Sequence, residues 1–273
     1  MKQLIVITAE RGRFWLNIRE IFAYRELIVF LAWRDIMAQY KQAFFGVAWA
    51  VVRPVFAVGV YSLVFGKVAG LSSGGMPYPL FALCGITAWN LFASSLEQST
   101  VSLLANTNLV TKVYFPRQIV PLASLGRGLV DFLIASALLV LLMLLYRQPP
   151  SGTIIFLPLF MAAGMILILG LGFFASALCA KYHDVKMAVP FLLQMWFWIT
   201  PVAYGLENIP ENLRLLFYLN PMTWIIEGFR WSILGTGEQD LFRTLMTCLM
   251  ASGVFIAGYV YFHFSERELA DII

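Results

Sequence analysis

Only 12% of the 273 residues are charged, 19 Lys and Arg against 15 Asp and Glu, and 60% are hydrophobic. Soluble domains carry about 25% charged residues, so this composition excludes an ordinary water-soluble protein. The mean hydropathy of +0.80 instead predicts several segments that are apolar enough to cross a bilayer.

Three stretches support a polytopic membrane protein because they contain no Asp, Glu, Lys or Arg. They cover residues 148–180, 187–206 and 244–265, and they are 33, 20 and 22 residues long. A helix that crosses the hydrocarbon core needs about 20 apolar residues. We therefore expect the fold class to be an all-α membrane protein.

The first 41 residues differ from the rest because charged and apolar positions are mixed. On a helical wheel, one apolar arc holds Phe14, Trp15, Ile18, Ile21, Phe22, Ile28 and Val29. Most charged residues lie off this arc, although Arg25 interrupts it. The pattern predicts an amphipathic helix at the cytoplasmic membrane interface. A short soluble cap without a membrane role is the alternative.

Apolar runs bounded by charge, Pro or Gly then predict a transmembrane domain of residues 42–265. We expect six spans, at about 44–65, 80–104, 121–146, 154–180, 187–206 and 241–263. Between the last two, the apolar run 215–226 has only 12 residues and contains Asn220-Pro221. It is too short to cross, so we expect a re-entrant element at about 207–230. Residues 266–273 form a cytoplasmic tail in this prediction.

The distribution of Lys and Arg predicts the orientation of these spans. With a cytoplasmic N-terminus, 12 of the 19 lie in inside segments, four in outside loops and three within or beside spans. Cytoplasmic segments of membrane proteins carry the excess of positive charge. Both termini are therefore expected in the cytoplasm.

Several charged residues are costly at their predicted depth. Arg53 falls about 13 Å into the first span, where an unpaired charge costs at least about 2.5 to 3.5 kcal/mol. Glu97 lies in the polar stretch 94–100, which is too hydrophilic to face lipid. Both are candidates for lining a pathway, although Arg53 could also pair with an acid or snorkel to an interface. Arg127 and Asp131, four residues apart, are expected to form an intrahelical ion pair.

Aromatic residues recur along the first span and extend this candidate pathway. Trp49 and Phe56 are seven residues apart with Arg53 between them, so they share one helical face. Sugar rings, with apolar CH faces and hydroxyl rims, suit such a surface better than bare ions do. An interfacial belt or lipid-facing bulk is the alternative reading of these aromatics. The expected substrate channel comprises Tyr40, Phe44, Trp49, Arg53, Phe56 and Glu97.

The residues that usually carry chemistry do not form an enzyme site. Cys84, Cys179 and Cys248 lie far apart in apolar stretches, which favours neither disulfides nor a metal site. His183 and His263 have no Cys, Asp or Glu cluster at metal-ligand spacing. The sequence lacks a GxxxxGKS or GxxxxGKT motif, so this chain cannot bind ATP through a P-loop. We expect no catalytic residue, metal or cofactor, and any ATP energy must come from a partner.

Four motifs resemble the membrane subunits of bacterial polysaccharide ABC exporters. They are 33–42, WRDIMAQYKQ, with Gly46, Trp49 and Pro54 after it; 112–121, KVYFPRQIVP; 182–185, YHDV; and 218–223, YLNPMT. These subunits are type-2 ABC permeases of the Wzm-like, KpsM-like and TagG-like kinds, which export O-antigen, capsule or teichoic acid. The resemblance covers about residues 30–265, in order and spacing.

This resemblance implies a permease subunit rather than an enzyme, working as a homodimer in the bacterial inner membrane. Two copies of a separate ATPase would hold ATP and Mg²⁺, and the substrate would be a lipid-linked polysaccharide such as O-antigen, with no nucleic-acid partner. Two cytoplasmic loops would contact the ATPase, through Lys112, Tyr114, Phe115, Pro116 and Arg117 and through Tyr182, His183, Asp184 and Val185. The family commonly has Arg where this chain has His183. Asn220, Pro221 and Trp224 would form an outer gate.

Three other functions fit parts of the sequence. A type-2 ABC permease for a small drug or lipid would share most of these motifs. A secondary transporter would need inverted repeats and a charged relay, for which only Arg53 and Glu97 are available. A membrane enzyme acting on lipid-linked sugars would need a base and a nucleophile near the outer acids. Those acids are Glu207, Glu211, Glu227, Glu238 and Asp240.

Overall fold

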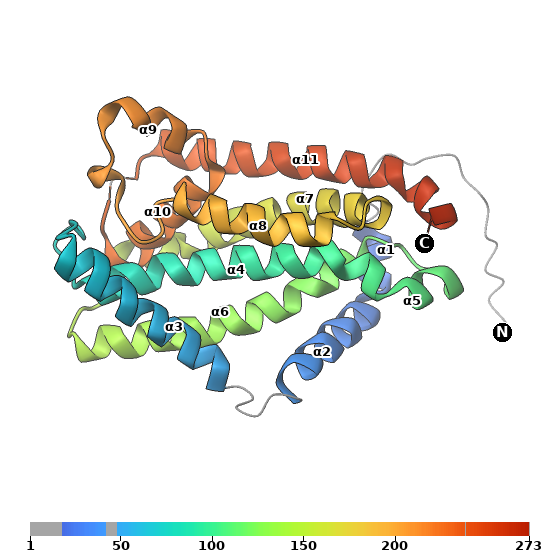
Figure 1. The fold of residues 1–273 in the computed structure, drawn as a ribbon, viewed down its shortest axis with the longest axis horizontal. Helices are drawn as coiled ribbons and strands as arrows, with labels where there is room; N and C mark the ends of the chain where they lie inside the picture. The colour runs from blue at the N-terminus through green and yellow to red at the C-terminus, as the bar shows by residue number, and fades with distance from the viewer. Residues whose placement is uncertain (1–17, 42–47, 238, 273) are drawn as a thin grey trace.

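The computed structural model describes residues 18–41, 48–237 and 239–272, and these ranges form helices without any strand (Figure 1). This confirms the predicted all-α fold class. The elements in chain order are α1 (Ile18–Ala23), α2 (Arg25–Lys41), α3 (Ala48–Tyr61), η1 (Ser62–Val68), α4 (Tyr78–Ala105), α5 (Thr107–Lys112), α6 (Ile119–Leu145), η2 (Gly152–Phe156), α7 (Leu157–Lys181), α8 (Val185–Trp198), η3 (Leu206–Asn208), α9 (Glu211–Tyr218), α10 (Pro221–Leu234) and α11 (Leu241–Ile272).

Five helical segments of the described chain are long and apolar enough to cross a membrane. They are Ala48–Val68, Tyr78–Ala105, Ile119–Leu145, Gly152–Lys181 and Leu241–Glu266. They correspond to five of the six predicted spans. The last of them belongs to α11, whose backbone stays helical to Ile272 through most of the predicted tail.

The span predicted over 187–206 is not one continuous helix. Helix α8 has 14 residues and ends at Trp198, so it is about 21 Å long, against a hydrocarbon core of about 30 Å. Two features of the structure end this helix. The residue before Pro201 is disfavoured in helical conformation. The carbonyl groups of Pro201 and Val202 also accept hydrogen bonds from the distant Arg230.

Helix α4 is the centre of the bundle and packs against α3, α6, α7, α8 and α10. Its polar stretch permits close packing, because Ser95 and Ser99 are buried where neighbouring helices present glycine. A Cβ atom at Gly128 of α6 would overlap Ser95 Oγ, and one at Gly172 of α7 would overlap Ser99 Oγ. Small residues of this kind let helix backbones approach within a membrane. The prediction that this stretch avoids lipid is confirmed for both serines.

Loops and short helices gather at two opposite ends of the bundle (Figure 1). One end holds α1, α5, the turn between α7 and α8, and the C-terminal part of α11. The opposite end holds η1, α9, α10 and the connection between α6 and α7. The loops that the charge count assigned to one side of the membrane therefore do lie together.

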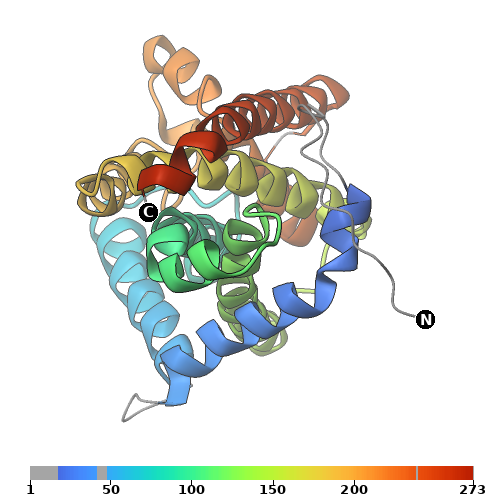
Figure 2. The same ribbon diagram turned by 90° about the vertical axis from the view of Figure 1, so that its right-hand side faces the viewer.

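Helix α2 crosses the bundle obliquely, from α1 toward the side that carries α3 (Figure 2). It packs on α6 through the buried Leu31, while its Phe30 and Trp33 are exposed, as is Phe22 of α1. The expected amphipathic helix is interrupted at Tyr24, which separates α1 from α2. Phe14 and Trp15, which belong to the predicted apolar arc, precede the first described residue.

Candidate functional site

A cavity of about 370 Å³ lies among α3, α4 and α6 and extends to α8. Its lining includes Trp49 and Arg53 of α3, Glu97 of α4 and Asp131 of α6. Three residues of the predicted channel thus line one cavity, although they come from two different helices. All three are exposed in the single chain, so the cavity opens on its surface.

The wall formed by α3 combines an aromatic ring with a positive charge. The guanidinium carbon of Arg53 lies 5.9 Å from the centroid of the Trp49 ring, which is within the range of a cation–π contact. Pro54, the next residue, is buried against the bundle. In the part of the chain that is described, Arg53 forms no salt bridge, so the ion-pair alternative for this residue is not what the structure shows.

The opposite wall is a polar stripe on α4. Asn90, Ser94 and Glu97 follow one another at steps of four and three residues, and all three line the cavity. An amide, a hydroxyl and a carboxylate supply both hydrogen-bond donors and acceptors. Facing Trp49, they make a surface that can bind the hydroxyl rim of a sugar while an aromatic ring contacts its apolar face.

Tyr40 reaches this site from α2 by donating its phenol hydrogen bond to Asp131 Oδ1. Burial, and after it the hydrogen bond to Asp131, raises the pKa of Tyr40 above its ordinary value. The phenol is therefore a neutral donor at physiological pH. The intrahelical pair predicted for Arg127 and Asp131 is wrong, since no salt bridge joins these two described residues. The reason is that α2 crosses α6 at Asp131 and supplies another donor.

Besides Tyr40, which contacts Asp131 but is not itself among the lining residues, two further residues of the predicted channel are not part of this lining. Phe56 is 74% exposed on α3, on the same helical face as Trp49, but it is not among the residues that line the cavity. Phe44 falls between the described ranges, so its position stays a prediction.

The first predicted coupling loop lies at the bundle end that holds α5. Lys112 and Tyr114 are exposed, Pro116 is half-buried, and Phe115 packs in an apolar cluster with helices of the bundle. Arg117 donates from Nη1 to a backbone carbonyl of α11 at 2.8 Å. The loop therefore has exposed side chains on a base that is fixed to the bundle.

The second predicted coupling loop is the short turn between α7 and α8, at the same end. Tyr182, His183 and Asp184 are exposed, and Val185 is half-buried where α8 begins. The ammonium group of Lys181 lies 5.9 Å from the centroid of the Tyr182 ring. Both loops therefore present exposed side chains at the same end of the bundle.

The predicted gate residues form the corner that joins α9 to α10. Asn220 Oδ1 caps α10 by accepting from the backbone of Met222 at 3.0 Å, and it also accepts from Trp196 Nε1 at 2.9 Å. Its amide nitrogen donates to Thr200 Oγ1 at 2.8 Å. Asn220 thus links the end of α8 to the start of α10. Its role as a gate remains a prediction.

The other two gate residues stabilise the same corner. Pro221 occupies the first position of α10, where its missing N–H costs nothing. Trp224 is buried and donates from Nε1 to the carbonyl of Tyr218 at 2.7 Å. The two rings also stack, with centroids 5.0 Å apart and planes 21° apart.

Arg230 is the residue that sequence reasoning missed, because the charge count placed it in an outer loop. Its side chain is 0% exposed, and Nη1 donates to Glu227 Oε1 at 2.9 Å and to the carbonyl of Pro201 at 2.8 Å. Its guanidinium carbon lies 3.7 Å from the centroid of the Phe81 ring. The sequence did contain one signal of a buried ion pair, namely a Glu and an Arg three residues apart inside an apolar helix.

Comparison with known proteins assigns the chain to a family. Residues 26–234, most of the chain, match the ABC-2 type transporter family. The chain belongs to this family. The sequence resemblance inferred from the four motifs is therefore confirmed, and this ABC-2 family member is a multi-pass membrane permease.

Several curated relatives of this permease are named for polysaccharide transport. The O-antigen export system permease protein RfbA of Myxococcus xanthus is 29% identical over 215 residues, which cover 78% of this chain and 82% of the relative. RfbA of Klebsiella pneumoniae is 26% identical over 206 residues, covering 75% and 79%. The polysialic acid transport protein KpsM of Escherichia coli is 23% identical over 206 residues, covering 74% and 78%.

Proposed function

We propose that the chain is the permease subunit of an ABC exporter that moves a lipid-linked polysaccharide, such as O-antigen, across the bacterial inner membrane. The observation that carries this proposal is the cavity in which Trp49 and Arg53 face the polar stripe of α4. Relatives named O-antigen export permeases at 29% and 26% identity support the same class of substrate.

The exposure of the cavity lining supports a homodimer. Arg53, Asn90 and Glu97 belong to predicted spans, yet they are exposed in the single chain. Charged groups that face lipid are costly, so they normally face protein or a water-filled path. A second copy of the chain, packed against the neighbouring α3 and α8, would turn two half-open cavities into one channel.

The assembly would place the ATPase at the end that holds α5 and both coupling loops. That end carries most of the Lys and Arg of the predicted inside segments, which favours a cytoplasmic location for it and for both termini. Helix α8 would act as a shortened fifth crossing of six, and α9 and α10 would form the re-entrant outer segment. ATP and Mg²⁺ would be held by the partner, and no cofactor by this chain.

Export of the polymer tests this function. In cells whose own copy of the gene is deleted, Arg53→Gln and Trp49→Ala should each lower surface polysaccharide about tenfold, which corresponds to about 1.4 kcal/mol at the transport barrier. Lipid-linked polymer should accumulate inside these cells, because synthesis does not depend on the cavity. The measurement is polymer in surface extracts and in spheroplast lysates.

Arg147→Gln is the matched control for this experiment, since Arg147 is exposed at the end of α6 and does not line the cavity. It should export like the wild type, with equal amounts of each variant in the membrane. Normal export by both single variants, Arg53→Gln and Trp49→Ala, would refute the proposed transport path through the cavity. Normal surface polymer in cells that lack the chain would refute the function.

Purification of the tagged chain from its native membranes tests the partner. A protein with a P-loop should copurify in equal molar amount, and the complex should hydrolyse ATP. Double alanine substitution of the exposed Lys112 and Tyr114 should lower its recovery, while Val113→Ala, between them, should not. Repeated recovery of the chain alone would contradict the ATPase assignment.

A further inference from the structure

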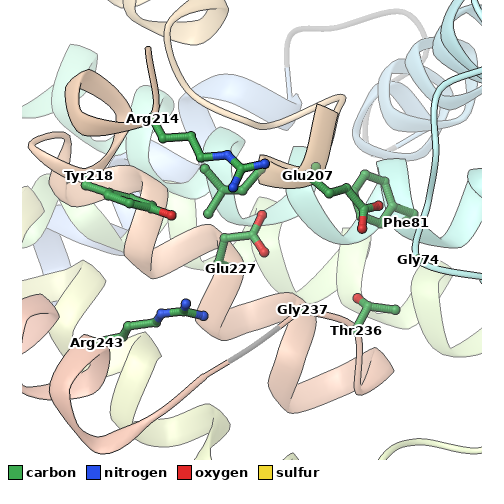
Figure 3. Close-up of a pocket in the computed structure, with 11 residues that line it drawn as sticks. Gly74, Phe81, Glu207, Arg214, Tyr218, Glu227, Thr236, Gly237 and Arg243 are labelled. Carbon is green, nitrogen blue, oxygen red and sulfur yellow. The ribbon is translucent and has the colours of Figure 1, made fainter. Parts of the chain in front are cut away.

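A second cavity, of about 270 Å³, lies at the end of the bundle that holds α9 and α10 (Figure 3). Segments far apart in the sequence line it, including the loop at Gly74, the loop at Glu207, α9 and the start of α11. It is separate from the cavity among α3, α4 and α6, and the proposed transport path makes no use of it.

The charged lining of this pocket contains both signs. Glu207 and Glu227 contribute carboxylates, and Arg214 and Arg243 contribute guanidinium groups. Figure 3 shows the ends of Arg214, Glu227 and Arg243 pointing toward a common space. A free cation would meet two positive groups there, and a free anion would meet two negative ones. A neutral ligand with many hydroxyl groups can instead donate to the carboxylates and accept from the guanidinium groups.

Two of these charged groups are held in place. Glu227 Oε1 accepts a hydrogen bond from the buried Arg230. The other carboxylate oxygen, Oε2, lies close to Gly237 of the lining, because a Cβ atom added to that glycine would be 3.0 Å away from it. The second carboxylate oxygen is therefore on the pocket side. Arg214 donates from Nε to the carbonyl of Ile209 at 3.1 Å, which fixes the direction of its guanidinium.

The pocket also contains a buried hydroxyl group that lacks a hydrogen-bond partner. Thr236 lines it and is 8% exposed, and its hydroxyl has no hydrogen-bond partner among the described residues. A buried hydroxyl without a partner is unfavourable, and a hydrogen bond to a ligand hydroxyl would offset that cost. Tyr218 adds an aromatic wall whose ring is held by its stack on Trp224.

We propose that this pocket binds one neutral sugar unit of the polysaccharide, an inference that rests on the proposed export function. Mixed charge, an unpartnered hydroxyl and a fixed aromatic ring together match the hydroxyl groups and the apolar face of a sugar ring. The volume is slightly below the roughly 300–1,000 Å³ of typical ligand pockets, so it suits a single ring.

Direct binding tests the proposal on the full chain purified with its ATPase in lipid nanodiscs. Glucose, galactose, mannose and rhamnose are titrated separately by saturation-transfer NMR, with inorganic phosphate and Ca²⁺ as ionic probes. At least one of the four sugars should bind the wild type. Thr236→Val, which keeps the shape, and Glu207→Gln should each weaken that binding about tenfold, as expected for one lost hydrogen bond to a buried or charged group.

Glu211→Gln is the control, because Glu211 is exposed on α9 and does not line the pocket. Its affinity for the sugar should match the wild type, and no variant should melt below the wild type, so that weaker binding does not reflect loss of the fold. Absence of sugar binding, equal binding by every variant, or binding of phosphate or Ca²⁺ alone would overturn the proposal. Polymer export by the same wild-type chain is measured in parallel. Export without sugar binding refutes only the pocket, whereas sugar binding without export refutes only the function.

Discussion

Among single residues, Arg230 contributes most to the structure of the α9–α10 end. Its guanidinium joins Glu227 on its own helix to the carbonyl groups of Pro201 and Val202, which follow α8. Burial of a charged arginine is costly unless acceptors surround it, and the planar fork of arginine reaches several at once. Here Nη1 and Nη2 have acceptors, while Nε has none among the described residues. This side chain therefore fixes the turn after α8 to α10.

Replacement of Arg230 should be severely destabilising. Arg230→Met leaves Glu227 as an uncompensated buried carboxylate, which costs about 3–5 kcal/mol. Arg230→Lys keeps the charge but loses the fork, so it should also lower the melting temperature in detergent, by a smaller amount. Arg147→Met, at an exposed position, should melt like the wild type. Equal melting of Arg230→Met and the wild type would show that this network does not stabilise the fold.

The sequence singled out residues whose cost depends on depth alone, although their role in transport stays a prediction. Arg53 and Glu97 were identified because charge is expensive within a span, and both line the cavity. Arg230 was missed although its partner Glu227 is only three residues away, because its other partners are backbone carbonyls 28 and 29 residues earlier, which no local pattern shows. The partner of Asp131 was predicted wrongly for the same reason, since Tyr40 is 91 residues away.

Among the helices, α2 is positioned by one polar contact in addition to its apolar packing on α6. Tyr40→Phe removes the hydrogen bond to Asp131, and loss of a hydrogen bond to a charged group costs about 1.5–3 kcal/mol. The variant should therefore melt below the wild type at pH 7. Tyr146→Phe, at the exposed end of α6, should not.

The pH dependence of this difference follows from the raised pKa of Tyr40. The folded state holds the phenol proton more tightly than the unfolded state, whose phenol has a pKa of about 10. The contribution is complete below that value and is lost as the pH rises from there toward the folded pKa. The gap between wild type and Tyr40→Phe should shrink above about pH 10. A gap that widened there would contradict the assignment of Tyr40 as donor.

Helix boundaries were predictable where composition decides them and not where a distant contact does. The five long helical segments follow their apolar runs, even where the helix type changes within a run, as from α3 to η1 and from η2 to α7. Helix α8 ends early because Pro201 and the fork of Arg230 redirect the chain, although residues 187–206 are free of charge. Apolarity alone therefore overestimated its length.

For the whole molecule, the sequence predicted which loops share an end, since positive charge is distributed by side of the membrane. The structure shows those loops together (Figure 1). The exposed side chains of Trp49, Arg53 and Glu97 also leave the cavity open on the surface of the single chain. In the proposed homodimer, a second copy closes the cavity, and neither the pattern of one sequence nor one chain contains that copy. The proposed channel is thus a property of the assembly.

Photocrosslinking of the exported polymer tests the central claim most directly. A benzophenone amino acid placed at Asn90, on the cavity wall, should yield adducts carrying the ladder of polymer lengths in intact exporting cells. The same group at Leu141, exposed on α6 away from the cavity, should yield none. Adducts at residue 90 alone would place the polysaccharide in the cavity among α3, α4 and α6. Their absence, or equal adducts at both positions during normal export, would contradict this account.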